Sequence, residues 1–251
     1  MSKSVSAGAR KAALRRASRE TEVVVALDLD PERPRAEIDS GIGFLDHMLG
    51  SLALHSGWSL SLACRGDLVV DEHHSAEDCA IALGEALARA VAKGVSAGRP
   101  PRRFGSACAP MDEALARAVL DFSGRPFCRT DLALEGARLG ALAGENVVHF
   151  FSSLASSARM TLHLDVLAGE NSHHKAEAAF KALALAFREA LAVDDGASRA
   201  GAAESGDAEA RPGEAAGASA KGSVALEEIS EADFARIKSE IERKRDAERG
   251  S

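Results

Sequence analysis

The pentapeptide HHSAE at residues 73–77 returns as HHKAE at residues 173–177, and each copy heads a long stretch of helical periodicity. One further histidine precedes each copy and lies inside an apolar segment of helical periodicity. His47 stands 26 residues before the first copy, and His149 stands 24 residues before the second. Six of the eight histidines therefore belong to one recurring pattern, which predicts an internal duplication of the chain.

The apolar periodicity around the two copies predicts a similar order of elements in both parts of the chain. In the first part we expect a strand at 22–30, a helix at 43–55, a strand at 58–64 and a helix at 75–93. In the second part we expect strands at 114–122, 126–134 and 159–167, and helices at 145–157 and 175–192. We therefore predict two half-repeats, residues 20–98 and 99–193, that mix strands and helices.

Three segments lie outside the half-repeats. Residues 1–19 are expected to form a loose N-terminal arm. Residues 194–222 are dominated by small and acidic residues that cannot build a core, so we expect a flexible linker. Residues 223–251 carry Phe234, Ile237 and Ile241 at helical spacing after Ser230, which predicts a terminal helix that is exposed or docks on the rest.

Composition excludes several classes of protein. The 31 basic and 38 acidic residues give a net charge of −7, which argues against a nucleic-acid partner. A membrane span would need about 18 consecutive apolar residues, and the chain has no such window. The N-terminus lacks the apolar core of a secretory signal, although a transit peptide is an alternative there. The four cysteines show no C-x-x-C spacing, so we expect reduced thiols and a cytoplasmic protein.

The repeated motif suggests metal binding. Residues four apart share a helix face, so His73 and Glu77 can chelate one ion, and the second copy repeats this geometry. The adjacent His74 is turned by about 100° and points elsewhere, which suggests two ions. Imidazole and carboxylate ligands without thiolate suit manganese, iron or zinc. The expected ligands divide into two sets of three histidines and one glutamate, drawn from His47, His73, His74, Glu77, His149, His173, His174 and Glu177.

The alternative for any single histidine is a structural role, as a helix cap, at the surface or in the core. This alternative is strongest for His47 and His149, because each lies in an apolar helical segment. His55 and His163 fall outside the pattern and are expected to be structural.

Several longer motifs occur in one order: GIGFLDHML (41–49), DEHHSAED (71–78), RFG (103–105), PMDEAL (110–115), DFSGRP (121–126), HFF (149–151) and GENSHH (169–174). Over about residues 15–193 and 219–222, the chain thereby resembles the imidazoleglycerol-phosphate dehydratases of histidine biosynthesis. The resemblance implies an α+β fold of two duplicated β-β-β-α-β-α halves, like domain 2 of ribosomal protein S5, each a sheet covered on one face by helices. It also implies a homo-oligomer of 24 subunits built from trimers, with metal sites between subunits.

The resemblance further implies the reaction. D-erythro-imidazole-glycerol 3-phosphate loses water to give imidazole acetol phosphate, with two Mn²⁺ ions per site holding the ring as an imidazolate on the way to a diazafulvene-like intermediate. The implied catalytic residues are Glu20, as base or proton shuttle, with His47, His74, Glu77, His174 and Glu177. The implied residues for the substrate's phosphate are Arg103, Arg125, Lys181, Ser219 and Lys221.

The chain departs from the family pattern at Ser18, where threonine is usual, and at Val148, where glutamate is usual. The loop at 94–102 and the stretch before Lys221 are also longer. Two other functions compete with the dehydratase. A two-metal hydrolase would need bridging carboxylates that the spacing does not provide. A non-enzymatic assembly protein would use the clusters only to join subunits, and the cations at Arg103, Arg125 and Lys181 favour an enzyme over it.

Overall fold

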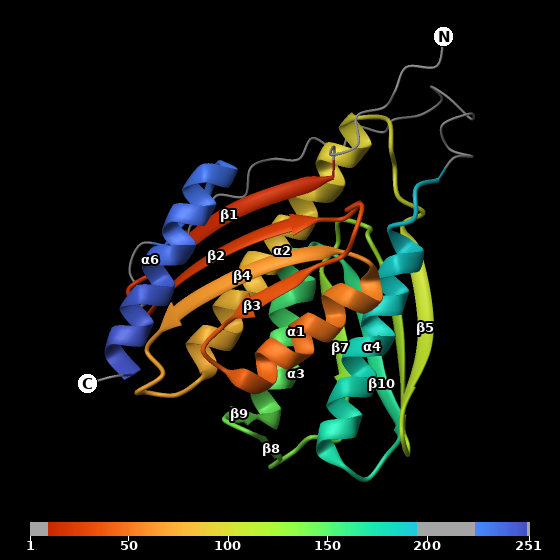
Figure 1. Ribbon diagram of the computed structural model, residues 1–251. Coiled ribbons are helices and arrows are strands. Elements are labelled where there is room, and N and C mark those ends of the chain that lie inside the picture. The colour runs from red at the N-terminus through yellow and green to blue at the C-terminus, as the bar shows by residue number, and fades with distance from the viewer. Residues whose placement is uncertain (1–9, 195–223, 250–251) are drawn as a thin grey trace.

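Two β-sheets face each other across a layer of helices (Figure 1). The computed structural model describes residues 10–194 and 224–249. One sheet has five strands and the other four, and the helices between them bury their apolar faces in one continuous core. Among the described residues, no helix combines the length and the apolar character that a membrane crossing requires.

The first half has the order β-β-β-α-β-α. Its elements are β1 (Lys11–Ala17), β2 (Thr21–Asp28), β3 (Ala36–Asp39), α1 (Gly43–Ser56), β4 (Ser59–Gly66) and α2 (His73–Ser96). The strands lie in the order β1-β2-β4-β3, with β3 parallel to β4 and the other pairs antiparallel. The parallel pair makes α1 cross the sheet between β3 and β4, which places it on the same face as α2 (Figure 1).

The second half repeats this topology. Its elements are β5 (Phe104–Met111), β6 (Ala114–Asp121), β7 (Phe127–Asp131), α3 (Gly144–Ser157), β10 (Thr161–Ala168) and α4 (Ser172–Ala190). The strand order β5-β6-β10-β7, with β7 parallel to β10, matches the first half strand for strand. A small hairpin, β8 (Arg138–Leu139) and β9 (Leu142–Ala143), precedes α3. The predicted duplication and the α+β fold are confirmed.

The helices of the two halves pack crosswise, α2 on α3 and α1 on α4. Glycine permits the α2–α3 contact: a Cβ added at Gly84 would lie 2.8 Å from the carbonyl oxygen of Leu154 and 2.7 Å from Cβ of Ser157. No side chain larger than hydrogen fits there without moving one helix. Each half therefore contributes helices to both sides of the molecule's centre, and this packing decides which histidines meet.

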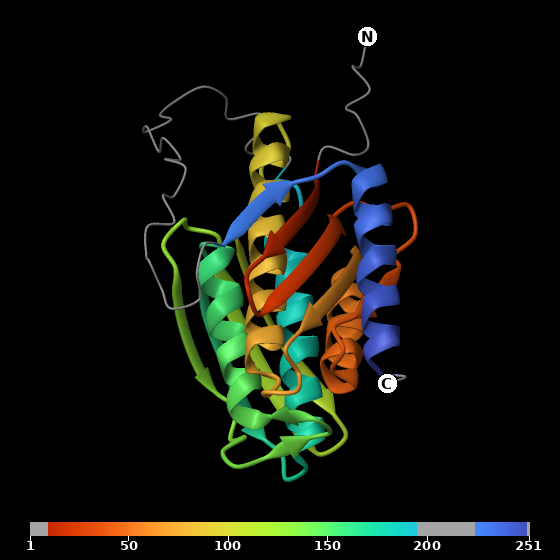
Figure 2. The same ribbon diagram turned by 90° about the vertical axis from the view of Figure 1, so that its left-hand side faces the viewer.

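The C-terminal segment completes the first sheet. Strand β11 (Ala225–Glu228) pairs antiparallel with β1, and α6 (Glu231–Arg249) lies on the outer face of the sheet (Figure 2). There Ile237 and Ile241 pack on Val24 and Ala63, which point away from the main core. The predicted terminal helix is confirmed, and it docks. The five-stranded sheet is consequently covered on both faces, whereas one covered face was expected.

Two expectations need correction. Residues 1–19 do not all form a loose arm, because residues 11–17 are strand β1. This strand buries Ala12, Leu14 and Arg16, so its inward face carries only one large apolar residue. Strands β3, β5 and the hairpin were also not predicted. Within the predicted linker at 194–222, only Asp194 belongs to the described residues.

Candidate metal centre

Both histidine doublets sit on the first turn of a helix, and in each case a preceding side chain accepts a hydrogen bond from a backbone N–H group of that turn. The side chain of Asn171 accepts hydrogen bonds from the backbone N–H groups of His173 and His174, at 2.9 and 3.3 Å. At α2, the carboxylate of Asp71 accepts from the N–H of His73 at 2.8 Å. Such caps fix where the first helical turn begins, and so they fix the direction of the histidines.

One group of potential ligands consists of His73 and Glu77 on α2 and His149 on α3. Their ligand atoms all lie within 4.8 Å of one another, with Nε2 of His149 3.1 Å from the Glu77 carboxylate. The rings of His73 and His149 stack at a centroid distance of 4.7 Å. The amide oxygen of Asn146 accepts from Nδ1 of His73 at 2.8 Å, which leaves the Nε2 lone pair for a ligand.

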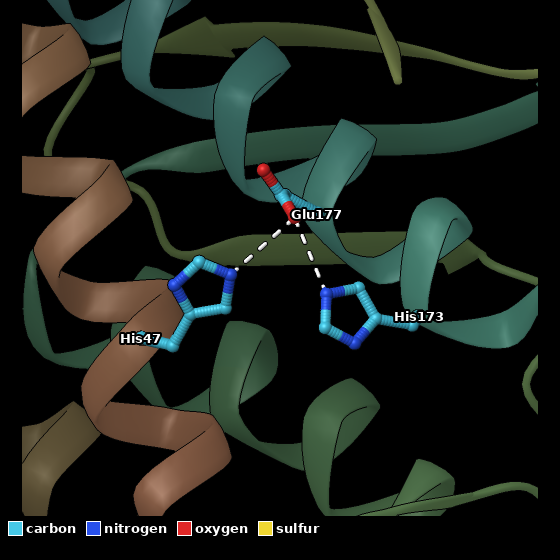
Figure 3. A group of neighbouring side chains, drawn as sticks. All are labelled: His47, His173 and Glu177. Carbon is cyan, nitrogen blue, oxygen red and sulfur yellow. Dashed lines mark hydrogen bonds and ion pairs between the residues drawn. The ribbon is translucent and has the colours of Figure 1, made fainter. Parts of the chain in front are cut away.

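The second group consists of His173 and Glu177 on α4 and His47 on α1 (Figure 3). Nε2 of His47 and Nε2 of His173 lie 3.4 and 3.3 Å from the same Glu177 oxygen. The ammonium of Lys181 contacts the other oxygen of Glu177 at 2.8 Å. Burial opposes ionisation of Glu177, but Lys181 and His47 outweigh burial, and so the pKa of Glu177 lies below its ordinary value. The carboxylate is thus kept in the charged form that binds cations.

Each group draws its third member from the other half of the chain. His149, from the second half, joins the doublet helix of the first half, and His47, from the first half, joins that of the second. The crosswise packing of α2 on α3 and of α1 on α4 causes this exchange. Sequence order alone associates His47 with His73, whereas the fold separates them into different groups.

His74 and His174 lie outside both groups, as their position one residue after His73 and His173 predicts. Nδ1 of His74 contacts the Asp67 carboxylate at 2.9 Å, and Nδ1 of His174 contacts Glu113 at 2.6 Å. The hydrogen bond to Glu113 raises the pKa of His174. Among the described residues, each group therefore holds two histidines and one glutamate, and the expected sets of three histidines are not assembled within one chain.

Glu20 lies in the turn between β1 and β2, beside the end of β4. It lines a cavity of about 540 Å³ together with Asp67, Arg19, Arg65 and Arg245. Asp67 also contacts His74, so the cavity adjoins the side of α2 that the His73 group does not use. Glu20 and His74 are thus linked through Asp67, and the role of Glu20 in moving protons stays a prediction.

The predicted phosphate ligands are divided by the fold. Lys181 joins the His47 group through Glu177. The N–H of Arg103 donates to the carbonyl of Ala190 at 2.9 Å, at the far end of α4 from His173. With 19 residues at 1.5 Å each, α4 is about 28 Å long. Arg125, whose carbonyl accepts from Thr161 at 3.2 Å, shares that far end. Ser219 and Lys221 lie outside the described residues.

Four partners of the site were not predicted from the sequence: Asp67, Glu113, Asn146 and Asn171. Glu113 and Asn171 lie in two of the motifs quoted above, PMDEAL at 110–115 and GENSHH at 169–174, and Asp67 lies in the short stretch GDL at 66–68, within the range of the resemblance. The sequence contains these residues in recognisable stretches. It does not show that they contact a histidine, because that contact depends on how the chain segments pack on the helices.

The chain resembles proteins of one family over most of its described length. The family model for imidazoleglycerol-phosphate dehydratase matches residues 40–187. An imidazoleglycerol-phosphate dehydratase of Phytophthora nicotianae is 51% identical over 74% of this chain, which spans only 40% of that relative. One of Candida glabrata is 46% identical over 70% of this chain and 90% of the relative.

Solved structures show the same likeness. The crystal structure of imidazoleglycerol-phosphate dehydratase from Staphylococcus aureus superposes with a TM-score of 0.62 at 34% identity, over 72% of this chain and 99% of that one. The structure of the Pyrococcus furiosus protein in complex with (S)-C348 gives 0.61 at 35% identity, over 72% and 94%.

Proposed function

The chain belongs to the imidazoleglycerol-phosphate dehydratase family of hydro-lyases, and from that premise we propose that it removes water from D-erythro-imidazole-glycerol 3-phosphate to give imidazole acetol phosphate. The observation that supports this most directly is the pair of matched groups, each with two imidazoles and one carboxylate within 4.8 Å. Two such groups related by the internal duplication suit two ions in equivalent surroundings. A cytoplasmic location stays a prediction.

The donor set fits manganese. Imidazole nitrogens and carboxylate oxygens suit Mn²⁺, and three protein ligands leave positions open for a further histidine and for substrate. We propose that His47, His173 and Glu177 hold one ion and that His73, Glu77 and His149 hold the other, with His74 and His174 serving ions shared with neighbouring subunits. When bound, Mn²⁺ supplies Lewis acidity that favours the deprotonated form of the substrate's imidazole ring.

The hydrogen that leaves the substrate sits on a carbon beside the imidazole ring, and it is only weakly acidic. We propose that Glu20 moves this proton, because its carboxylate lines a cavity together with Asp67, which contacts His74. Lys181 holds Glu177 in its ionised form and is available to the phosphate. Arg103 and Arg125 would complete the phosphate site as charged donors.

A complete site requires more than one chain in this proposal. Arg103 and the His173 doublet stand at opposite ends of α4, about 28 Å apart, so one substrate molecule cannot reach both within a single subunit. We propose that neighbouring subunits supply the missing residues in a homo-oligomer of trimers, with 24 subunits as the expected size. His74 and His174, outside the single-chain groups, are then available to bridge subunits.

The test is an assay of product formation from imidazole-glycerol phosphate. Metal-free protein is expected to be inactive, and added Mn²⁺ is expected to restore dehydration. An assembled protein that stays inactive at saturating Mn²⁺ would favour the alternative, in which the clusters only join subunits.

A further inference from the structure

The C-terminal helix brings one buried arginine to the strand ends of the first half. The side chain of Arg245, on α6, is only 8% exposed. Its guanidinium pairs with the carboxylate of Asp39 and donates to the carbonyls of Asp39, at 3.1 Å, and Cys64, at 3.5 Å. Since β3 and β4 are parallel neighbours with Asp39 beside Ala63, Arg245 joins the ends of both strands.

Both strands lead directly into the candidate metal centre. After Asp39, the chain passes through Ser40, whose N–H and hydroxyl donate to the Asp46 carboxylate at 2.7 and 2.6 Å, and Asp46 is followed by His47. After Cys64, it passes through Asp67, which contacts His74, and enters α2 at His73. One guanidinium therefore contacts the two strands that precede the helices carrying the first half's histidines.

Arg245 also touches the space around Glu20. It lines the same cavity of about 540 Å³ as Glu20 and Asp67. Gly41, in the turn before α1, has φ +84°, and a Cβ there would lie 2.9 Å from Leu68 Cδ1 and 3.8 Å from Arg245 Cδ. The turn into α1, the loop into α2 and the arginine are thus packed directly on one another.

We propose that Arg245 is a positioning residue for the reaction: by holding Asp39 and Cys64 together, it sets the spacing between α1 and α2 and hence the relative placement of His47 and the His73–His74 doublet. The inference rests on the proposed function, and α6 lies outside the residues 40–187 that the family model matches. The competing interpretation is that α6 only covers the apolar face formed by Val24 and Ala63.

The experiment compares Arg245→Met with Arg243→Met, a matched control because Arg243 lies on the same helix and is exposed. Mn²⁺ binding is followed by the electron paramagnetic resonance signal of free Mn²⁺, independently of turnover, and kcat and KM are measured in parallel. For Arg245→Met we expect the half-saturating Mn²⁺ concentration to rise roughly tenfold, as when a partner of a metal ligand is lost. We expect kcat to fall and KM to change little, because the phosphate-binding residues are untouched.

Two further variants separate positioning from folding. Ile241→Ala removes apolar contact under α6 but leaves the arginine, so it should lower the unfolding temperature while keeping the Mn²⁺ affinity. Arg245→Lys keeps the charge but loses the planar fork, and it should fall between wild type and Arg245→Met. If Arg245→Met does not fold, Arg245→Lys and Asp39→Asn are compared with Arg243→Met by the same Mn²⁺ measurement.

The inference would be overturned if Arg245→Met bound Mn²⁺ as tightly as wild type. If that variant does not fold, wild-type affinity in both Arg245→Lys and Asp39→Asn would overturn it. A wild-type protein that binds Mn²⁺ but does not dehydrate imidazole-glycerol phosphate would instead overturn the proposed function, and the change in Mn²⁺ affinity would still decide the role of Arg245 in positioning.

Discussion

The histidines are held by neighbouring oxygen atoms. Asn146 binds Nδ1 of His73, Asp67 binds Nδ1 of His74, and Glu113 binds Nδ1 of His174. An acceptor at Nδ1 places the ring proton there and leaves Nε2 with its lone pair, the form that a metal requires. The hydrogen bond to the Glu113 carboxylate also raises the pKa of His174.

Replacing His149 by alanine tests the first ligand group. Because His149 supplies one of its three protein ligands, His149→Ala should lose about one of the two bound Mn²⁺ ions and most of the activity. Bound manganese per chain is measured by atomic absorption after gel filtration, alongside product formation. His55→Ala is the matched control, since His55 is exposed near the end of α1. Unchanged manganese content in His149→Ala would remove this residue from the ligand set.

Arg125→Ala should separate substrate binding from metal binding. Arg125 lies at the end of the second sheet, away from both ligand groups of its own chain, so the variant should keep its manganese and show a raised KM. Steady-state kinetics and the same metal analysis check this. Loss of manganese equal to that of His149→Ala would contradict the role given to Arg125.

Ionised Asp30 should make the free energy of unfolding depend on pH. Burial opposes its ionisation, but the guanidinium groups of Arg10 and Arg99 outweigh burial and hold the pKa of Asp30 below its ordinary value. The unfolded chain therefore takes up the proton first, and the stabilisation, complete above the unfolded pKa of about 3.9, is lost as pH falls through the folded pKa. Wild type should have a larger free energy of unfolding than Asp30→Asn at about pH 6. This difference, measured by urea unfolding, should shrink as the pH is lowered to about 3. An advantage independent of pH would exclude this cause.

Much of the candidate site could be predicted from the repeated motif, because residues four apart on a helix share a face whatever surrounds them. His73 with Glu77 and His173 with Glu177 follow from that rule. The partner histidines could not be assigned, since only tertiary packing brings α3 to α2 and α1 to α4. Glu113 lies 61 residues before His174, and no local spacing predicts such a contact.

At the scale of elements, the site depends on helices that approach closely. The predicted helices were found because they are long and amphipathic, and their ends lie within a few residues of the expected positions. The missed strands carry weaker signals. β5 buries only glycine and alanine, β1 buries a single large apolar residue, Leu14, and β3 has only four residues. Because the chain is duplicated, the strand order of one half is repeated in the other.

Gly84→Ala tests the close approach of α2 and α3. The added methyl group would meet the carbonyl oxygen of Leu154 at 2.8 Å, so the helices must separate, at a cost of about 1–3 kcal/mol. Gly50→Ala on α1 is the control, because nothing lies within 4 Å of a Cβ added at Gly50. Alanine there should be neutral or stabilise the helix by about 0.5–1 kcal/mol. Urea unfolding and manganese content are measured for both.

Gly84→Ala should also weaken Mn²⁺ binding, since α3 carries His149 and α2 carries its partners. Equal stability and equal metal content in the two glycine variants would mean that helix separation does not govern the ligand group.

At the scale of the whole molecule, the two halves are alike in topology but differ in what they expose. The first sheet carries β11 and α6 on its edge and outer face, whereas the second sheet carries no such addition from the described residues (Figures 1 and 2). The His173 doublet and Arg103 lie at opposite ends of α4. If Arg103 has the role proposed above, a single chain does not bring all parts of its site together.

Mixing two impaired variants, assayed at a substrate concentration far below the raised KM of Arg125→Ala, tests whether subunits share sites. His173→Ala and Arg125→Ala, unfolded and refolded together, should regain part of the activity, because mixed oligomers contain some sites with neither substitution. Each variant refolded alone is the control. A mixture no more active than its components would place both residues in the same subunit's site.

The most direct measurement is anomalous X-ray scattering at the manganese edge, from crystals of active protein grown with Mn²⁺. We expect manganese beside His73, Glu77 and His149, and again beside His47, His173 and Glu177. Crystals that convert substrate while both positions are empty of manganese would contradict it.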